Sequence, residues 1–576
     1  MKRISFYILI IGLISTSISC KKNLLNITPS SSVDANTVFA DPNLTEAFVN
    51  NNYRDLDYGF YNTHWQAFML AGATDEVLSA YEGYIGVDVV NQGLINSSPT
   101  GEGFTGTFDG NPYPRQQAWA NNYKYIAQCN TFFQNINKVS GLSSGDKNRL
   151  IGEMMTLRAF RYFQLVRHYS GVPIITKTYG ITDKFDVKRN TTDECFQFII
   201  TQLDSAINNY LPATAPAIGK IDRGVAMAIK SRVLLSYASP LFNANNDPAR
   251  WQAAADAAKA VMDLNRYALV PWLNYKNMFI KFDPSNSEYI FVTINQAGLP
   301  SEGHQDNYPW PGLTFEYAVM PFDRGGNIMY TPTQQMVDSY ETIDGKSISD
   351  PTSIYNANDP YANRDPRFNV DVLHQGSPVN QTTIDFSNPN GFDFNQNQTV
   401  TGYLMGKFVD PSVYDPAAIT LGSGQGAQPW IHLRYAEILL NYAEAINEAK
   451  GPADAYAAIN LVRNRANMPS LPTGLSQSDM RARIWNERKV ELAFEESRFW
   501  DVRRWKIASQ TNNITCMGVN VTNNKGVLTY TYQVPNTGGN LNYNPVRVFK
   551  DPANYFFPIP QSEIAADPNL IQNPGY

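Results

Sequence analysis

The sequence predicts a mostly α-helical protein, a scaffold of about four tetratricopeptide-like helix pairs with an irregular, loop-rich middle region that carries short strands. Apolar residues recur at helical spacing over residues 116–264 and again over 434–505. The stretch 271–429 between them is rich in Gly, Pro, Asn and Asp and has only short apolar runs. With 576 residues, 43% of them hydrophobic, the chain can form two subdomains or one array of repeats.

Residues 1–19 predict a signal peptide for secretion. Two basic residues follow the initiating Met, and the mostly apolar stretch after them is shorter than the roughly 20 residues that a membrane span requires. Cleavage after Ser19 would leave Cys20 first, at the place of the lipidated thiol in a bacterial lipobox. We therefore expect Cys20 to be lipidated; the alternative is an ordinary signal peptide with a chance cysteine. Residues 20–40 are polar and are expected to form a tether.

Residues 41–270 are expected to form an N-terminal helical region. Several segments carry apolar residues every three or four positions, as on one face of an amphipathic helix. Residues 85–114 hold six glycines and three prolines without such periodicity and are expected to be loop. The expected helices cover residues 43–53, 116–139, 150–169, 193–210, 223–238 and 250–264.

Residues 271–429 are expected to form a loop-rich region between the helical regions. Two apolar runs in it, EYIFVTI at 288–294 and NVDVL at 369–373, predict short strands. The acidic stretch at 359–365 could hold calcium, but its composition is more typical of turns.

Residues 430–576 are expected to form a C-terminal helical region. Its first helix carries one apolar stripe at i, i+3, i+4, i+7, i+8 and i+11, made of Tyr435, Ile438, Leu439, Tyr442, Ala443 and Ile446. Gly451 and Pro452 end this helix, and a second helix with Ala455, Ile459 and Val462 runs back against it. The pair spans roughly one tetratricopeptide period of about 34 residues. Such pairs cannot bury their apolar faces alone, so they imply a stacked scaffold.

Several motifs follow one another in an order that is typical of one family. They are MTLRAFRYFQLVRHYSGVPII at 155–175, TPTQQMVDSYETIDG and NRDPRF in the middle, then RYAEILLNYAEAINE, INLVRNRANMP, NERKVELAFE, SRFWDVRRW and FFPIPQSEI. In this order the motifs resemble the SusD-like (RagB/SusD) family, which are cell-surface nutrient-binding lipoproteins of Bacteroidota-type bacteria. The resemblance covers nearly the whole chain.

The resemblance implies a function as well as a fold. It implies a lipoprotein anchored in the outer membrane through Cys20 and facing the cell exterior. Such a protein binds oligosaccharides or polysaccharide and delivers them to a SusC-like, TonB-dependent transporter. The task is reversible capture, so the resemblance implies no catalytic residue, no cofactor and no metal. It also implies that residues 271–429 supply part of the ligand site.

Candidate ligand-binding residues follow from sugar chemistry together with the resemblance. A sugar ring has an apolar C–H face and a hydroxyl edge, so it is met by aromatic rings together with amides or carboxylates. In the family, a TDE-like turn such as Thr74–Glu76 precedes a sugar-stacking aromatic, and the loop before the GG pair supplies further contacts. Asn327 differs from an aromatic found there in some relatives. The expected ligand-binding residues are His64, Trp65, Tyr81, Glu82, Tyr84, Tyr308, Trp310 and Asn327. The alternative for any one ring is packing beneath a loop.

Three acids at i, i+4 and i+8 could be read as a glycosidase site. They are Glu487, Glu491 and Glu495. Basic residues interleave with them, so we expect ion pairs on a solvated or inter-helix face instead. The interleaved bases are Arg488, Lys489, Arg498, Arg503 and Arg504.

Composition and spacing exclude several other functions. The net charge is −6, and no basic run marks a nucleic-acid-binding face. The five histidines have no zinc-ligand spacing, and no phosphate-binding loop or nucleophile elbow occurs. Cys129 and Cys195 lie in apolar helices and are expected to be buried thiols, while a disulfide that includes Cys516 stays open. The remaining alternatives are a lipoprotein for a non-glycan nutrient such as peptides, a glycan-cleaving enzyme, and an adaptor that assembles other proteins.

Overall fold

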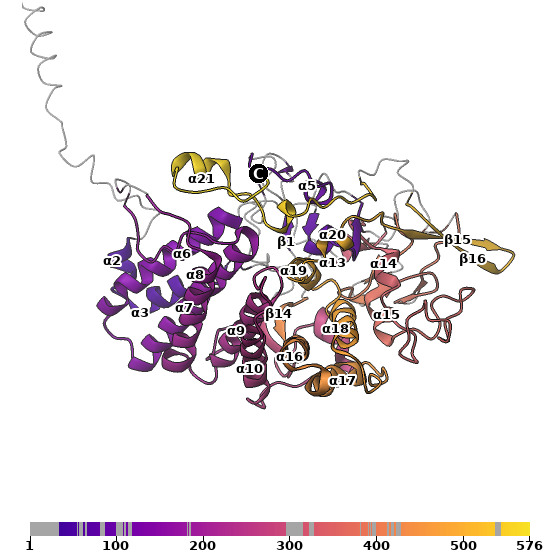
Figure 1. Ribbon diagram of the computed structural model, residues 1–576, viewed down its shortest axis with the longest axis horizontal. Coiled ribbons are helices and arrows are strands. Elements are labelled where there is room, and N and C mark those ends of the chain that lie inside the picture. Colours follow the sequence, from indigo (N-terminus) through magenta and orange to yellow (C-terminus); the bar gives the residue numbers. More distant parts are fainter. Residues whose placement is uncertain are drawn as a thin grey trace, which may run out of the picture.

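The computed structural model shows a helical scaffold with an irregular region packed on one side of it (Figure 1). Its N-terminal helices lie at the left of the view, its C-terminal helices from α16 to α18 lie at the centre, and the loop-rich region lies at the right. The predicted fold class is confirmed. The structure describes residues 34–54, 56, 61–63, 66–80, 87–98, 107–108, 111–112, 118–180, 183, 186–294, 315–321, 326, 328–380, 382–389, 391, 393, 399–411, 414–415, 420–421, 428–535 and 543–576.

The N-terminal helices begin at short polar side chains that accept hydrogen bonds from the first turn. Thr191 forms a capping box with Glu194, and Ser143 accepts a hydrogen bond from the Asp146 amide. The cap at Ser143 explains why its helix begins six residues before the predicted 150. The N-terminal helices are α2 (Ala35–Val38), α3 (Pro42–Asn51), α5 (Asp88–Asn91), α6 (Ala118–Asn135), α7 (Ser144–Tyr169), α8 (Thr192–Ser205), α9 (Arg223–Ala238) and α10 (Pro248–Met262), with a π-helical turn η4 (Ala206–Tyr210) after α8.

Neighbouring helices pack in sequence order, as expected for stacked pairs. Helix α6 contacts α7, α7 contacts α8, α8 contacts α9 and α9 contacts α10. Gly152 allows the close approach of α7 to the η4 turn, since a Cβ atom there would lie 2.7 Å from the Leu211 side chain. Helix α10 then packs against α16 and so joins the two helical regions into one scaffold.

The C-terminal helices confirm the stripe that the sequence predicts. Ile438, Leu439, Ala443 and Ile446 are buried between helices, while Tyr435 and Tyr442 are half-buried. Gly451 follows the last residue of α16 with φ 93°, which a glycine adopts readily. These helices are α16 (Tyr435–Lys450), α17 (Ala455–Arg465), α18 (Gln477–Glu491), α19 (Ser497–Arg504), α20 (Ala508–Thr511) and α21 (Gln561–Ala566).

The middle region is held at its two ends by one strand pair. Strand β6 (Tyr289–Thr293), predicted at 288–294, pairs antiparallel with β14 (Trp430–Arg434), which leads directly into α16. The strand predicted at 369–373 is wrong for its first half. Asp365 caps helix α15 (Pro366–Asp371) and a proline occupies its first position, so only Val372 and Leu373 remain extended, as β8.

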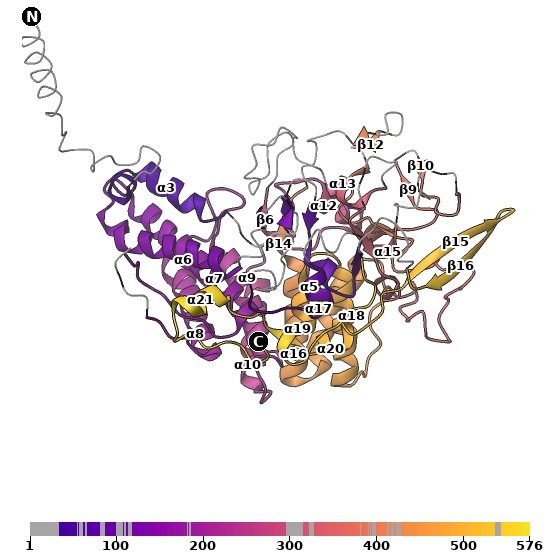
Figure 2. The same ribbon diagram turned by 90° about the horizontal axis from the view of Figure 1, so that it is seen from above.

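Short elements complete the described part of the chain. All strands in it form two-stranded sheets. Strands β15 (Gly518–Asn524) and β16 (Val527–Gln533) form a hairpin that projects from one end of the molecule (Figure 2) and was not predicted. The others are β1 (Tyr61–Thr63), β2 (Gln66–Phe68), β3 (Val77–Ser79), β4 (Thr107–Phe108), β5 (Asn111–Pro112), β7 (Tyr330–Pro332), β9 (Pro378–Val379), β10 (Thr382–Thr383), β11 (Leu404–Met405), β12 (Tyr414–Asp415), β13 (Thr420–Leu421), and helices α11 (Trp272–Tyr275), α12 (Asn277–Ile280), α13 (Phe315–Val319) and α14 (Gln334–Val337).

The three acids at i, i+4 and i+8 form ion pairs, but not on a solvated face. The Glu487 and Glu491 side chains are at most 2% exposed, and Glu495 is 7% exposed. Their partners come from segments far apart in the sequence rather than from the interleaved bases, because α18 lies between the middle region and the other C-terminal helices. These partners are Arg367, Lys407, Arg434, Arg463 and Arg465.

The cysteines of the described residues are reduced and buried. Cys129, Cys195 and Cys516 are all free thiols, which confirms the expectation for the first two. Among the helices that the structure describes, none has the length and apolarity that a bilayer-spanning segment requires.

Candidate functional site

The sequence-predicted ligand-binding residues lie outside the part of the chain that the structure describes. This holds for His64, Trp65, Tyr81, Glu82, Tyr84, Tyr308, Trp310 and Asn327, and also for Cys20. The structure does describe the residues on either side of most of these positions. The arrangement of those flanking residues shows whether the four segments start from one place.

Strands β3 and β7 bring two of the segments together. Ser79 pairs with Tyr330 in this antiparallel pair, and the Ala80 amide donates to the Met329 carbonyl at 3.0 Å. Ala80 is the residue before Tyr81, and Met329 is two residues after Asn327. The segments that carry Tyr81 and Asn327 therefore leave the fold side by side.

Helix α13 brings the third segment to the same place. It begins at Phe315, directly after the segment with Tyr308 and Trp310. The Met329 amide donates to the Ala318 carbonyl at 2.6 Å, and the Ile328 amide donates to the Met320 carbonyl at 3.2 Å. Gly326 permits this close return of the chain, because a Cβ atom on it would lie 2.0 Å from the Met320 carbonyl oxygen.

The hairpin of β1 and β2 adds the fourth segment. His64 and Trp65 connect the two strands, in which Thr63 pairs with Gln66. Strand β2 lies against α13, and the Met69 amide after it donates to the Tyr330 hydroxyl at 3.1 Å. We call the set of β1, β2, β3, β7 and α13 the loop frame. All four segments with predicted ligand residues start from this frame.

Buried acids of the TDE-like turn fasten the loop frame to the C-terminal helices. Asp75 accepts hydrogen bonds from Lys489 at 3.0 Å and from two nitrogens of Arg498 at 2.8 and 2.9 Å. Burial alone would raise the pKa of Asp75, but these two cations outweigh it and hold the pKa below its usual range. Asp75 and Arg498 are 423 residues apart, so spacing in the sequence could not have revealed this contact.

Glu76 of the same turn is in a different electrostatic environment. Its carboxylate accepts a hydrogen bond from the Phe494 amide at 3.1 Å. Burial raises the pKa of Glu76 to about 7, and the charge of neighbouring Asp75 acts in the same direction. Both acids of the turn are therefore buried supports of the frame, and their carboxylates face protein groups.

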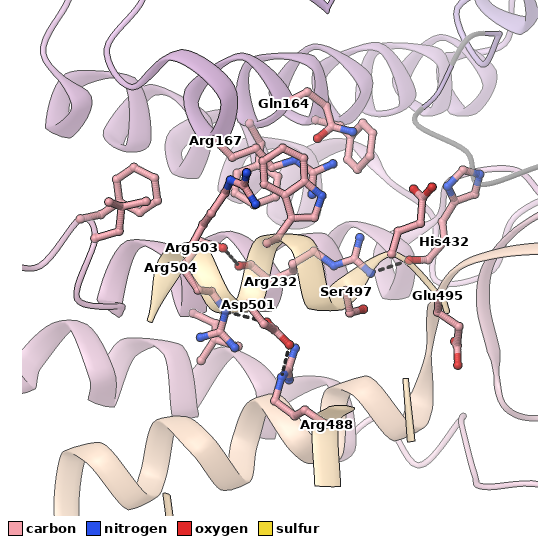
Figure 3. Close-up of a pocket in the computed structure, with 18 of the residues that line it drawn as sticks. Gln164, Arg167, Arg232, His432, Arg488, Glu495, Ser497, Asp501, Arg503 and Arg504 are labelled. Atoms are coloured by element: carbon pink, nitrogen blue, oxygen red, sulfur yellow. Dashed lines mark hydrogen bonds and ion pairs between the residues drawn. The ribbon is translucent and has the colours of Figure 1, made fainter. Parts of the chain in front are cut away.

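A second feature is a small polar pocket between α7, α9 and the C-terminal helices (Figure 3). Water-sized probe centres can occupy about 80 Å³ of it. We call it the arginine pocket, because five arginines line it together with Glu495, Glu496, Asp501 and several aromatic side chains. The arginines are Arg167, Arg232, Arg488, Arg503 and Arg504.

Most charges of the arginine pocket are neutralised within the protein. Asp501 accepts from Arg488 at 2.9 Å and from Arg504 at 2.8 Å. Arg232 forms an ion pair of 2.6 Å with Glu437 of α16, and the Glu496 carboxylate accepts from the Leu70 amide at 3.1 Å. These contacts connect the two helical regions and, through Leu70, the loop frame. The pocket has the contacts of a structural junction, with the exception of Arg503.

No metal centre is evident in the described residues. They contain no group of three or more His, Cys, Asp or Glu side chains arranged to hold a metal ion. Asp365, from the stretch considered for calcium, instead caps α15 and binds Arg367 at 2.7 Å. The arrangement that the structure shows is a rigid base from which several loops extend, a common design for binding sites.

Comparisons with known proteins agree with this architecture. The profile of the SusD family matches residues 287–576, which is just over half of the chain. A second profile, described as starch-binding associating with outer membrane, matches residues 90–235. Among curated proteins, the SusD-like protein P2 of Formosa agariphila is 24% identical over 475 residues, which cover 80% of each chain.

Solved structures share the fold over nearly the full length. A SusD-like protein from Bacteroides fragilis superposes with a TM-score of 0.75 at 26% identity, covering 95% of this chain and 99% of that one. A SusD-like carbohydrate binding protein from the same species gives a TM-score of 0.71 at 24% identity, covering 93% and 100%. The arrangement of helix pairs and middle region is therefore the one that these proteins have.

Proposed function

The chain belongs to the SusD family, and on that premise we propose that it captures oligosaccharides or polysaccharide at the cell surface. The captured glycan would then be delivered to a SusC-like, TonB-dependent transporter in the outer membrane. A lipid on Cys20 would anchor the protein there, facing outward. The family description names starch binding and association with the outer membrane, and one related structure is described as carbohydrate binding.

The convergence of four segments on the loop frame carries this proposal. Each segment holds at least one of the predicted aromatic or amide side chains, and the described residues beside them are joined by backbone hydrogen bonds. Aromatic rings and hydrogen-bonding groups from one small area can together cover both faces of a sugar. Asp75 and its cations hold this area on a rigid support, which limits the entropy lost on binding.

A glycan-cleaving function has less support. Glycosidases use two carboxyl groups that face the substrate, one of which is protonated. Burial would raise the pKa of Glu491, but Arg465, Arg434 and Arg367 outweigh it and hold the pKa below its usual range. Glu491 is therefore an ionised acid with no exposed surface, which suits structure better than catalysis.

Alanine variants of the loop aromatics test the proposal directly. Calorimetry against plant, host and microbial polysaccharides, with peptides in the same panel, would first identify the ligand. We expect Tyr81→Ala and Trp310→Ala to weaken its binding about tenfold or more, which corresponds to about 1.4 kcal/mol. Tyr532→Ala, on the projecting hairpin and 40% exposed, is the matched control and should bind normally.

Other outcomes distinguish the alternatives. Unchanged binding in both loop variants would contradict a site at the loop frame. New reducing ends after incubation with a glycan would indicate an enzyme, and binding of peptides alone would indicate another nutrient. For the anchor, Cys20→Ser should release the protein from the membrane fraction, and firm retention would contradict lipidation at this residue.

A further inference from the structure

Arg503 is a buried cation with few partners. The residue is 2% exposed, and its Nη1 donates to the Phe499 carbonyl at 3.2 Å. Its Nε and Nη2 have no hydrogen-bond acceptor among the residues that the structure describes. The guanidinium lies over the Phe499 ring at 3.5 Å from the centroid. Such a cation–π contact uses the face of the guanidinium, so the N–H groups in its plane remain available.

Other buried arginines of the described chain are treated differently by the fold. Arg434 binds three glutamates, with N–O distances of 2.6 to 2.7 Å to each. Arg364 lacks a carboxylate but donates to three backbone carbonyls at 2.6 to 2.9 Å. Arg503 has one carbonyl only. Burial lowers the pKa of Arg503 to about 9, which still leaves the group charged at neutral pH.

The side chain of Arg503 lies at a cavity that has room for a ligand. Arg503 lines the arginine pocket, whose 80 Å³ for water-sized probe centres exceeds the roughly 10–15 Å³ that one water molecule needs. In Figure 3 the Arg503 side chain extends toward Arg167 on α7, while Arg504 extends toward Asp501. The acids of the pocket have partners of their own: two arginines bind Asp501, Lys407 and Arg434 bind Glu495, and a backbone amide binds Glu496.

We propose that the arginine pocket binds a small oxyanion, a carboxylate or a sulfate, through the in-plane N–H groups of Arg503. A buried charge without a counter-charge costs several kcal/mol. An oxyanion removes this cost, because its oxygens match the spacing of two guanidinium N–H groups. The anion has two sources, a free ion or an acidic group on a glycan, and the second source rests on the proposed function.

Binding experiments on the purified full-length chain separate the two sources. Sodium acetate and sodium sulfate are compared with sodium chloride at equal ionic strength, by calorimetry and by the shift in Tm. Methyl glucuronide is compared with methyl glucoside, which lacks the carboxylate. We expect binding of at least one oxyanion with one ion per chain, weakened tenfold or more in Arg503→Met. Arg189→Met, which removes an arginine bound to backbone carbonyls outside the pocket, should leave it unchanged.

A crystallographic measurement keeps the proposal testable if Arg503→Met does not fold. Crystals soaked in sodium selenate should show an anomalous peak within hydrogen-bond distance of Arg503 Nε or Nη2, and Arg503→Lys should reduce its occupancy. Water alone at Arg503, or oxyanion binding that is equal in wild type and in a folded Arg503 variant, would overturn the proposal. Glucuronide binding that depends on Arg503 identifies a glycan as the source, and binding of inorganic ions alone identifies a free anion. Loss of glycan binding at the loop frame would leave the acetate and sulfate results intact.

Discussion

The N-terminal and C-terminal helices have the same pairwise arrangement but different contacts with their surroundings. Helices α7 and α8 pack with side chains such as Leu157, Val166 and Ile199, each at most 1% exposed. Helix α18 instead faces the middle region with Glu487 and Glu491, which bind arginines from α15, β14 and α17. Apolar packing has no preferred direction, whereas a buried ion pair requires both partners in good geometry. The second region therefore depends much more on distant parts of the chain.

Glu491→Gln should give the largest effect on this comparison. It removes the shared acceptor of Arg367, Arg434 and Arg465 and leaves three buried cations with fewer partners. We expect the free energy of unfolding in urea to fall by about 3–5 kcal/mol. The loss should persist at 1 M salt because buried pairs are little screened. Lys259→Met, which breaks an exposed pair on α10, is the control and should cost at most about 0.5 kcal/mol. A similar small cost for Glu491→Gln would contradict our interpretation of this region.

Leu157→Ala tests the apolar side of the comparison. Leu157 lies in the middle of α7 and is 1% exposed, so its removal leaves a cavity. We expect a loss of about 2–5 kcal/mol that does not change with salt or pH, measured by the same urea unfolding. Leu461→Ala, at a position 51% exposed, is the matched control and should stay within about 0.5 kcal/mol of wild type. A strong salt dependence for Leu157→Ala would show that charges also hold this region.

Gly326→Ala tests the close return of the chain in the loop frame. The added Cβ would meet the Met320 carbonyl at 2.0 Å, so the backbone between α13 and β7 must shift. We expect a loss of about 1–3 kcal/mol in unfolding free energy together with weaker ligand binding. Gly376→Ala is a control for the added methyl group, since nothing lies within 4 Å of a Cβ there, although its φ of 88° adds strain. Normal ligand binding by Gly326→Ala would separate the site from this part of the frame.

Asp371→Asn gives a smaller, pH-dependent effect. Burial raises the pKa of Asp371 to about 7, although Lys407 at 4.0 Å and the Tyr340 hydroxyl act in the opposite direction. The unfolded chain releases this proton near pH 4, so the native state holds more protons between pH 4 and 7. Its contribution to the unfolding free energy therefore falls as pH rises, by up to about 1.4 kcal/mol per pH unit. Urea unfolding at pH 5 to 8 should show Asn gaining on Asp; a constant difference would contradict the raised pKa.

The candidate site shows how far the sequence reaches. Resemblance placed ligand residues in four segments, and the structure shows that the described ends of those segments meet at the loop frame. Sequence reasoning did not foresee that Asp75 and Glu76 support this frame from below. Their partners Lys489, Phe494 and Arg498 lie more than four hundred residues away, and no local pattern connects them.

The sequence by itself determined the helices, because a helix depends on residues three and four positions apart and on its capping groups. Helix α9 covers the predicted 223–238, and α16 ends where Gly451 predicts. Tertiary structure alone decided which arginines bind Glu491 and where the four loops meet. It also left Arg503 buried with one carbonyl partner. These features depend on which segments fold against each other, and such contacts between distant residues leave no periodic signal in one sequence.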